Sequence, residues 1–325
     1  MRELSCMRAV HESLVEEINK NKKVYLMKKG SIFDRKFSED SNNIINDKVI
    51  IMPKSEATII SSAIGLSLIG LRPVVKLSQM EDIFLAFSAL VDQAAKLRYI
   101  SGGKLMFPIT FLCAENNVYY NDVSQHSDNP YSFLIHGGMK VVVPSSAYDA
   151  KGLFVSAIRD NDPVAVFLPT RVLAEKGEVP EEQYTIPLGK AEIKKIGSDI
   201  TVVATGHCVN IAIDTARKLE AEEGISVEVF DPRTLFPFDN KTLEKSISKT
   251  GKVIIIDDSP KTCGFASMVS SIIMEEYYKY LKKPIWRITR ADVPVPFSEP
   301  LEEYVLPNSK KLENAIYDLM EGADE

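Results

Sequence analysis

Short apolar runs alternate with longer segments of helical period along this chain, and this alternation constrains its fold more than any other feature. The apolar run Val49–Met52, for example, precedes the uncharged segment 57–71, and a second apolar run follows at Val74–Leu77. Neighbouring parallel strands need a crossover of a dozen residues or more, usually a helix. The pattern therefore predicts an α/β fold of two doubly wound domains, each with a mainly parallel sheet covered by helices.

The same periodicities place the expected elements. In the first half we expect helices at 4–20, 57–69, 82–99 and 148–158, and strands at 24–27, 49–52, 74–77, 109–113, 140–143 and 164–168. In the second half we expect strands at 200–204, 227–230, 253–256 and 285–288, and helices at 209–222, 240–248, 265–281 and 309–320. A polar, proline-bearing stretch at about 174–190 predicts a linker between domains at 1–180 and 190–325.

Composition excludes several functional classes. The 325 residues carry a net charge of −6, whereas a nucleic-acid surface needs a basic face. The four cysteines lack CxxC spacing, which argues against a zinc site or a disulfide framework. The uncharged segment 57–71 is short for a membrane span, and the N-terminus does not resemble a signal peptide. We therefore expect a cytoplasmic protein without nucleic-acid or membrane partners.

Glu56 is the most informative single residue. It follows Val49–Met52 and Pro53 and opens the uncharged segment, with Lys54 as the only cation close by in sequence. Burial raises the pKa of a carboxyl group, and a carboxyl held in this way can share a proton with a ring nitrogen. The other interpretation is a glutamate at a helix N-terminus that complements the helix dipole.

Common catalytic motifs are absent from the sequence. It contains no GxGxxG, GxxxxGK[ST] or GxSxG, and no Gly-Asp-Gly with a downstream Asn, which is the magnesium-diphosphate signature of thiamin enzymes. What remains is a set of isolated polar residues at the ends of expected elements: Glu56, the turn 79–82, His126 and the loop 160–162.

A family resemblance connects these positions. Met52-Pro53-Lys54-Ser55-Glu56, followed by Ile64-Gly65, resembles a segment of the beta subunits of thiamin-diphosphate-dependent 2-oxoacid dehydrogenases, which act on pyruvate, branched-chain 2-oxoacids or acetoin. The similarity continues in order through the blocks at 70–74, 94–103, 125–127, 140–145, 148–153, 157–164, 231–235, 249–252 and 292–296. It implies a transketolase-like pyrimidine-binding domain followed by a transketolase C-terminal domain.

The resemblance also implies a division of labour. In that family an alpha subunit with the Gly-Asp-Gly motif binds Mg²⁺ and the diphosphate of thiamin diphosphate, and the beta subunit supplies the pyrimidine pocket, usually in an α2β2 tetramer. Such a chain is active only with its alpha partner. The enzyme decarboxylates a 2-oxo acid or cleaves an acetoin-like ketone and passes the product to an acceptor such as a lipoyl-bearing acyltransferase.

The resemblance assigns roles to the residues of this sequence that occupy matching positions. Glu56 is expected to hydrogen-bond the N1′ nitrogen of the pyrimidine, with Met80, Asp82 and Phe84 around the ring. His126 matches a histidine that faces the substrate; a loop histidine satisfied by backbone groups is the alternative.

The loop at 157–162 resembles a potassium site built from oxygen ligands, which suit a hard cation. The resemblance assigns it Ile109, Ala157, Ile158, Asp160 and Asp162. A plain helix-to-strand turn capped by Asp and Asn side chains is the other interpretation.

Departures from the family pattern cluster near the expected active site. Lys28 and Lys29 replace an acidic pair, Lys76 replaces a glutamate, and Gln79 and Asp82 stand in a stretch that normally carries aromatic residues. These changes predict an altered substrate or acceptor. They leave open a specialised carboligase or a ketol- or acyl-transferase subunit, and a non-catalytic homologue that pairs with an alpha chain, although the retained Glu56 and His126 argue against the last.

Overall fold

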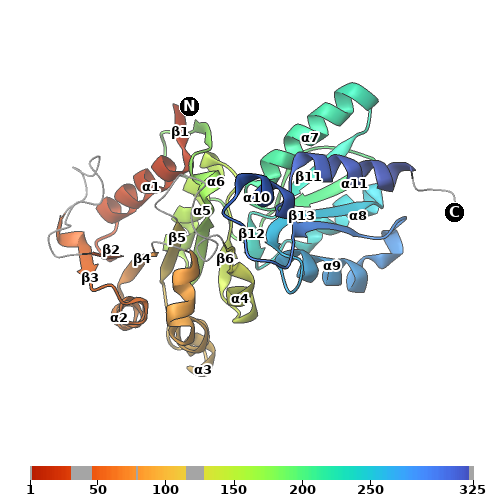
Figure 1. Cartoon of the computed structure of the whole chain (residues 1–325). Coiled ribbons are helices and arrows are strands. Elements are labelled where there is room, and N and C mark those ends of the chain that lie inside the picture. The colour runs from red at the N-terminus through yellow and green to blue at the C-terminus, as the bar shows by residue number, and fades with distance from the viewer. Residues whose placement is uncertain (1, 31–45, 78–79, 115–127, 322–325) are drawn as a thin grey trace. The chain divides into compact units, whose positions relative to one another are not determined.

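The computed structural model describes residues 2–30, 46–77, 80–114 and 128–321, which form two compact units (Figure 1). The first unit comprises residues 2–114 and Phe133–Leu188, and the second comprises the chain from Gly189 together with residues 128–132. Each unit contains a mainly parallel sheet, which confirms the predicted fold class. Among the described helices, none has both the length and the apolar character needed to cross a lipid bilayer.

In the first unit the strands follow the order β6-β7-β5-β4-β2-β3, and all of these neighbours are parallel. Their bounds are β2 Val24–Lys29, β3 Val49–Met52, β4 Arg72–Leu77, β5 Thr110–Ala114, β6 Lys140–Val142 and β7 Val164–Leu168. The α-helices of this part of the chain are α1 Cys6–Lys20, α2 Glu56–Leu68, α3 Leu97–Ile100, α4 Tyr131–His136, α5 Ala147–Arg159 and α6 Thr170–Leu173, and a 3₁₀ turn, η1 Asn46–Lys48, precedes β3.

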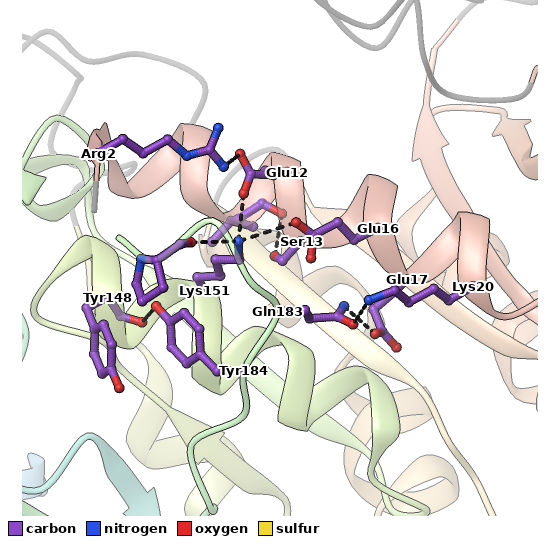
Figure 2. A network of polar contacts seen from close by, with 12 residues as sticks. Arg2, Glu12, Ser13, Glu16, Glu17, Lys20, Tyr148, Lys151, Gln183 and Tyr184 are labelled. Carbon is purple, nitrogen blue, oxygen red and sulfur yellow. Dashed lines mark hydrogen bonds and ion pairs between the residues drawn. The ribbon is translucent and has the colours of Figure 1, made fainter. Parts of the chain in front are cut away.

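Helices α1 and α5 lie side by side on one face of this sheet (Figure 1). Their apolar faces form the core, but Lys151 of α5 is also fully buried. Its ammonium group lies 2.6 Å from Glu12 and 3.3 Å from Glu16, both on α1, and 3.3 Å from the carbonyl oxygen of Pro180 (Figure 2). A buried lysine needs such partners because an unpaired buried charge is costly. Helices α1 and α5 are therefore joined by ion pairs as well as by apolar packing.

The opposite face is covered by α2 and by the segment 80–100, which is largely helical as expected over 82–99 but does not form one regular α-helix. The structure has a 3₁₀-helix η2 at Met80–Ala86, a π-helix η3 at Ala89–Ala94 and then the single turn α3. Helix propensity is a weak preference that tertiary contacts override. Here η2 buries Met80, Asp82 and Ile83 together, and Asp82 contacts a charged residue of β2.

The second unit has the strand order β14-β13-β10-β11-β9, in which β9 is antiparallel to β11 and the other pairs are parallel. Its strands are β9 Glu192–Lys195, β10 Ile200–Ala204, β11 Val227–Asp231, β12 Thr234–Phe236, β13 Val253–Pro260 and β14 Trp286–Arg290. Its helices are α7 Cys208–Glu223, α8 Asn240–Thr250, α9 Phe265–Glu276, η5 Tyr278–Tyr280, α10 Glu299–Val305 and α11 Ser309–Glu321.

The stretch expected to be a linker is partly ordered. Within 174–190, residues Lys176–Val179 form strand β8, which pairs antiparallel with β1 at Arg2–Ser5. The first and second units divide after Leu188.

Candidate functional site

The carboxyl ends of β2, β3 and β4 meet at one edge of the first sheet. The chain passes from β2 to β3 on one side and then returns to β4 on the other side of β2. Successive connections that leave in opposite directions create a switch point, which is where open parallel sheets bind ligands. The topology therefore places a candidate site beside β2.

Glu56 lies at this edge as the first residue of α2. Ser55 caps the helix, since its hydroxyl oxygen accepts a hydrogen bond of 3.4 Å from the backbone N–H of Thr58. An acidic residue in the first turn is favoured by the helix dipole, so the helix-terminus interpretation of Glu56 is correct whatever else the residue does.

Lys29, the last residue of β2, links Glu56 to η2. Its ammonium group lies 2.6 Å from Glu56 Oε1 and 2.5 Å from Asp82 Oδ2. All three side chains are largely buried, with exposed fractions of 12% for Lys29, 12% for Glu56 and 8% for Asp82. Sequence reasoning noted Lys29 and Asp82 as unusual but did not bring them together with Glu56.

This contact corrects the expectation for Glu56. Burial alone would raise the pKa of its carboxyl group, but the hydrogen bond and charge of Lys29, with a backbone hydrogen bond, outweigh burial and hold that pKa below its ordinary value. Burial would likewise lower the pKa of Lys29, and its two carboxylate partners raise it. The predicted upward shift at Glu56 was wrong because Lys29, and not Lys54, is its cationic neighbour.

The remaining predicted ring contacts differ in exposure. Met80 is buried, whereas the Phe84 side chain is about two-fifths exposed and packs edge-to-face against Phe133 at 5.2 Å between ring centres. An aminopyrimidine offers ring nitrogens and an amino group. Carboxylate acceptors and an aromatic ring are groups that can bind it, so the chemistry of Glu56, Asp82 and Phe84 fits such a ring.

The other unusual residues lie elsewhere. Lys28 and Lys76 occupy paired positions on β2 and β4 and face the side covered by α1 and α5, because strand side chains alternate between faces. Lys76 lines a cavity of about 420 Å³ together with α1 residues such as His11 and strand residues such as Leu112. Gln79 and His126 lie outside the described residues.

The proposed potassium loop is occupied by side-chain cations in this structure. Arg72 donates to the carbonyl oxygens of Ile158 at 3.0 Å and Asp160 at 2.8 Å. The Lys140 ammonium group lies 2.8 Å from the Asp160 carboxylate and 3.0 Å from that of Asp162. A potassium ion would have to share these oxygens with Arg72 and Lys140.

The other two residues of that loop prediction use their carbonyl oxygens in backbone hydrogen bonds. The carbonyl of Ile109 accepts from Val164 N at 3.0 Å, and that of Ala157 accepts from Asp160 N at 3.2 Å. Across the described part of the chain, no cluster of three or more His, Cys, Asp or Glu side chains is arranged to hold a metal. Potassium binding stays a prediction.

Comparison with known proteins covers nearly the whole chain. The transketolase pyrimidine binding domain matches residues 2–175, and the transketolase C-terminal domain matches residues 189–312. The chain belongs to the transketolase-like family. Glu56, Lys29 and Asp82 lie within residues 2–175, so the site described above falls in the part of this chain that matches the pyrimidine binding domain.

Relatives in this family are beta subunits. The beta subunit of acetoin:2,6-dichlorophenolindophenol oxidoreductase from Bacillus subtilis (strain 168) is 41% identical over 84% of this chain and 80% of its own length. The 2-oxoisovalerate dehydrogenase subunit beta of the same organism is 33% identical over 98% and 99%, and its pyruvate dehydrogenase E1 component subunit beta is 35% identical over 95% and 96%.

A solved structure supports the transketolase-like fold independently. The chain named as a split gene transketolase, inactive beta4 tetramer, superposes with a TM-score of 0.75 over 99% of both chains at 21% identity.

Proposed function

We propose that this chain is the beta subunit of a two-component thiamin-diphosphate enzyme that acts on a 2-oxo acid or an acetoin-like ketone. The observation that carries the proposal is Glu56, a largely buried carboxylate at the first turn of α2, at the switch point of the domain that matches the pyrimidine-binding family. Beta subunits of pyruvate, 2-oxoisovalerate and acetoin enzymes at 33–41% identity define the substrate classes to test.

The chemistry divides between cofactor and protein. When bound, thiamin diphosphate supplies the electron sink that lets a 2-oxo acid lose CO₂ or a ketone be cleaved. Glu56 binds the N1′ ring nitrogen and holds a proton at that atom, because its carboxylate is a hydrogen-bond acceptor at neutral pH. Phe84, whose side chain is partly exposed, would pack beside the ring, whereas Met80 is buried in the cofactor-free chain, and Asp82 would contribute its charge through Lys29.

An alpha subunit completes the site in this proposal. It carries the Gly-Asp-Gly motif that this sequence lacks, and with it Mg²⁺ and the diphosphate. The two chains assemble as α2β2, and His126 faces the substrate. The names of the relatives, each a subunit beta, support a partner of this kind.

Replacing the proposed acid tests the role of Glu56. Glu56→Gln keeps the size of the side chain but removes its charge, so the two-chain enzyme should assemble normally and lose turnover by about 10²-fold or more, a magnitude typical of acid–base groups. Turnover with pyruvate, 2-oxoisovalerate and acetoin measures the effect. Glu222→Gln, an exposed change on α7, is the control. Near-normal rates in Glu56→Gln would contradict the assignment.

The acceptor separates the two enzymatic alternatives. A dehydrogenase component transfers its product to a lipoyl group or to an electron-accepting dye, whereas a carboligase joins it to a second carbonyl compound. The charged pair Lys29–Asp82 beside Glu56 is the observation that keeps carboligation under test, because it changes the polarity next to the ring. Reductive acylation of a lipoyl domain supports the dehydrogenase, and a ketol product without it supports the carboligase.

Potassium can be tested separately from activity. If the loop at 157–162 binds the ion, the midpoint of thermal unfolding should rise in KCl relative to an equal concentration of NaCl, because a ligand that binds only the folded state stabilises it. Equal midpoints in the two salts would show that Arg72 and Lys140 suffice to neutralise the loop.

A further inference from the structure

One ammonium group serves two carboxylates at the candidate site. Lys29 ends β2, Glu56 begins α2 and Asp82 lies in η2, so three separate elements meet through a single nitrogen atom. The contacts are 2.6 Å to Glu56 and 2.5 Å to Asp82. Because both acids touch the same nitrogen, they are also close neighbours of each other.

Among the described residues, Lys29 is the cation that acts on the Glu56 carboxyl group. The Cys113 thiol of β5 lies in the negative field of Asp82 and Glu81, which together with burial raises its pKa. Lys76 of β4 and Lys28 of β2 point to the opposite face of the sheet. Lys29 is thus the cation that the described residues place directly against Glu56.

The charges within the cluster sum to one negative. Two adjacent carboxylates without a cation resist simultaneous ionisation, so one of them would retain a proton at neutral pH. With Lys29 in contact, the ionised form of Glu56 is favoured, and a carboxylate still has lone pairs for another donor after accepting one hydrogen bond. The cluster therefore presents Glu56 as an acceptor held in one orientation.

We propose that Lys29 is a positioning residue that clamps the Glu56 carboxylate, with Asp82 as the counter-charge that holds Lys29 in place. The inference rests on the proposed role of Glu56, and it adds two residues that set how that carboxylate meets its ligand. Lys29 acts through Glu56 and has no ligand contact of its own in this proposal.

Opposite shifts in two variants test the clamp. In Lys29→Met the Glu56 carboxyl loses its cation and keeps a negative neighbour, so its titration midpoint should rise by about one to three pH units. In Asp82→Asn the Glu56 carboxyl no longer shares the Lys29 ammonium group with a second carboxylate. Its titration midpoint should therefore fall below that of the wild type. Lys29→Arg should restore the wild-type value because it keeps the charge.

The measurement is made on the isolated chain without cofactor. Carboxyl-¹³C-glutamate labelling reports each titration by NMR, and the Glu56 signal is the one missing from Glu56→Gln. Lys28→Met is the matched control, since it removes a lysine from the adjacent position on the other face of β2. Midpoints that stay fixed in both Lys29→Met and Asp82→Asn, or that move in the same direction, would overturn the clamp.

The two-chain enzyme then separates a positioning role from a merely structural one. The acid limb of its pH–rate profile should move upward in Lys29→Met. Below the new midpoint, turnover of Lys29→Met at a given pH should be lower than that of the wild type. The difference should be about tenfold for each pH unit by which the midpoint has risen. A changed NMR midpoint with an unmoved pH–rate profile would overturn the positioning role. Normal turnover of Glu56→Gln would instead contradict the proposed role of Glu56, on which the clamp rests. The two failures are therefore distinguishable.

Discussion

Individual buried polar side chains of this molecule are held by specific partners, and Asp257 of β13 is the clearest example. It is fully buried and accepts hydrogen bonds from the hydroxyl groups of Tyr131, Thr205 and Ser259. Burial and the charges of Asp257 and Asp258 raise the pKa of Tyr131, so this phenol keeps its proton and remains a donor. Residues 128–132 belong to the second unit, and the hydrogen bond from Tyr131 to Asp257 holds them against β13 of that unit.

Tyr131→Phe should therefore destabilise the protein. It removes one of the three hydroxyl donors to a buried carboxyl group, and leaving such an acceptor short of a partner costs about 1–2 kcal/mol. Urea unfolding measures the loss. Tyr99→Phe, at a residue that is 90% exposed, is the matched control and should leave the free energy of unfolding unchanged. Equal effects of the two changes would mean that the Tyr131 hydroxyl contributes nothing to stability.

The Lys29 cluster makes stability depend on pH in a defined window. The pKa of Glu56 lies below its ordinary 4.5, so its contribution is present above pH 4.5 and is lost as the pH falls through the folded-state value. The pKa of Lys29 lies above its ordinary 10.5, so its contribution is present below pH 10.5 and is lost as the pH rises further.

The free energies of unfolding of wild type and Lys29→Met, measured across pH, should therefore differ most between about pH 4.5 and 10.5. The difference should shrink on both sides of that window. A difference that does not change with pH would show that Lys29 acts through packing alone.

At the residue scale the sequence predicted the position of Glu56 but not its electrostatic state. The position depends on a local pattern, an apolar strand followed by an uncharged helix. The state depends on Lys29 and Asp82, which are each more than twenty residues away in sequence and approach Glu56 only in the folded sheet. One further signal was available: strand alternation separates Lys29 from Lys28 and puts Lys29 on the α2 face.

Elements of this fold are joined by charge as well as by apolar packing, as α1 and α5 show. Lys151 has no exposed surface, and its partners Glu12 and Glu16 are each 24% exposed. Both glutamate side chains are therefore partly exposed and the lysine is not, but the Glu16 oxygen Oε2 is itself buried.

Lys151→Met should lower the free energy of unfolding by about 1–3 kcal/mol, less than the 3–5 typical of a fully buried pair, because the two glutamate side chains are partly exposed. Chemical denaturation measures the change, with the exposed Lys22→Met as control. A stability equal to wild type would show that the methionine packs well enough to replace the ion pairs.

Prediction of strands succeeded where the strand is a short, nearly continuous apolar run. The bounds of β3, β7 and β10 match the expected ranges to the residue. The segment 80–100 is helical but irregular: its apolar residues suit one continuous α-helix, whereas the part that carries Asp82, the partner of Lys29, is a 3₁₀-helix. The short strands β8 and β9 were missed because their sequences, Lys-Gly-Glu-Val and Glu-Ile-Lys-Lys, are too polar to stand out.

For the whole molecule, the proposed function predicts that one chain is not enough. The purified chain alone should show no turnover, and addition of its alpha partner should restore activity together with a larger mass in light scattering. A monodisperse single chain with full activity would contradict a shared site.

The end of α2 gives this association a specific test. Leu68 and Ile69 are half or more exposed at adjacent positions, and in the proposed association a partner chain would cover this apolar surface. Ile69→Glu should weaken assembly with the alpha partner, because it would bury a charge in that contact. Ile196→Glu, at a similarly exposed isoleucine of the second unit, is the control. Equal assembly of the two variants would place the contact elsewhere.

The pairing of β1 with β8 has a consequence for the order in which the first unit becomes complete. Arg2 lies opposite Val179 and Ser5 opposite Lys176, so the strand before α1 pairs with the strand that follows α6. Among the described strands β1 pairs with β8 alone, so its inter-strand hydrogen bonds need a segment that comes after β2 to β7 in the chain. A truncated chain that ends before Lys176 should therefore leave the backbone amides of residues 2–5 unprotected against hydrogen exchange.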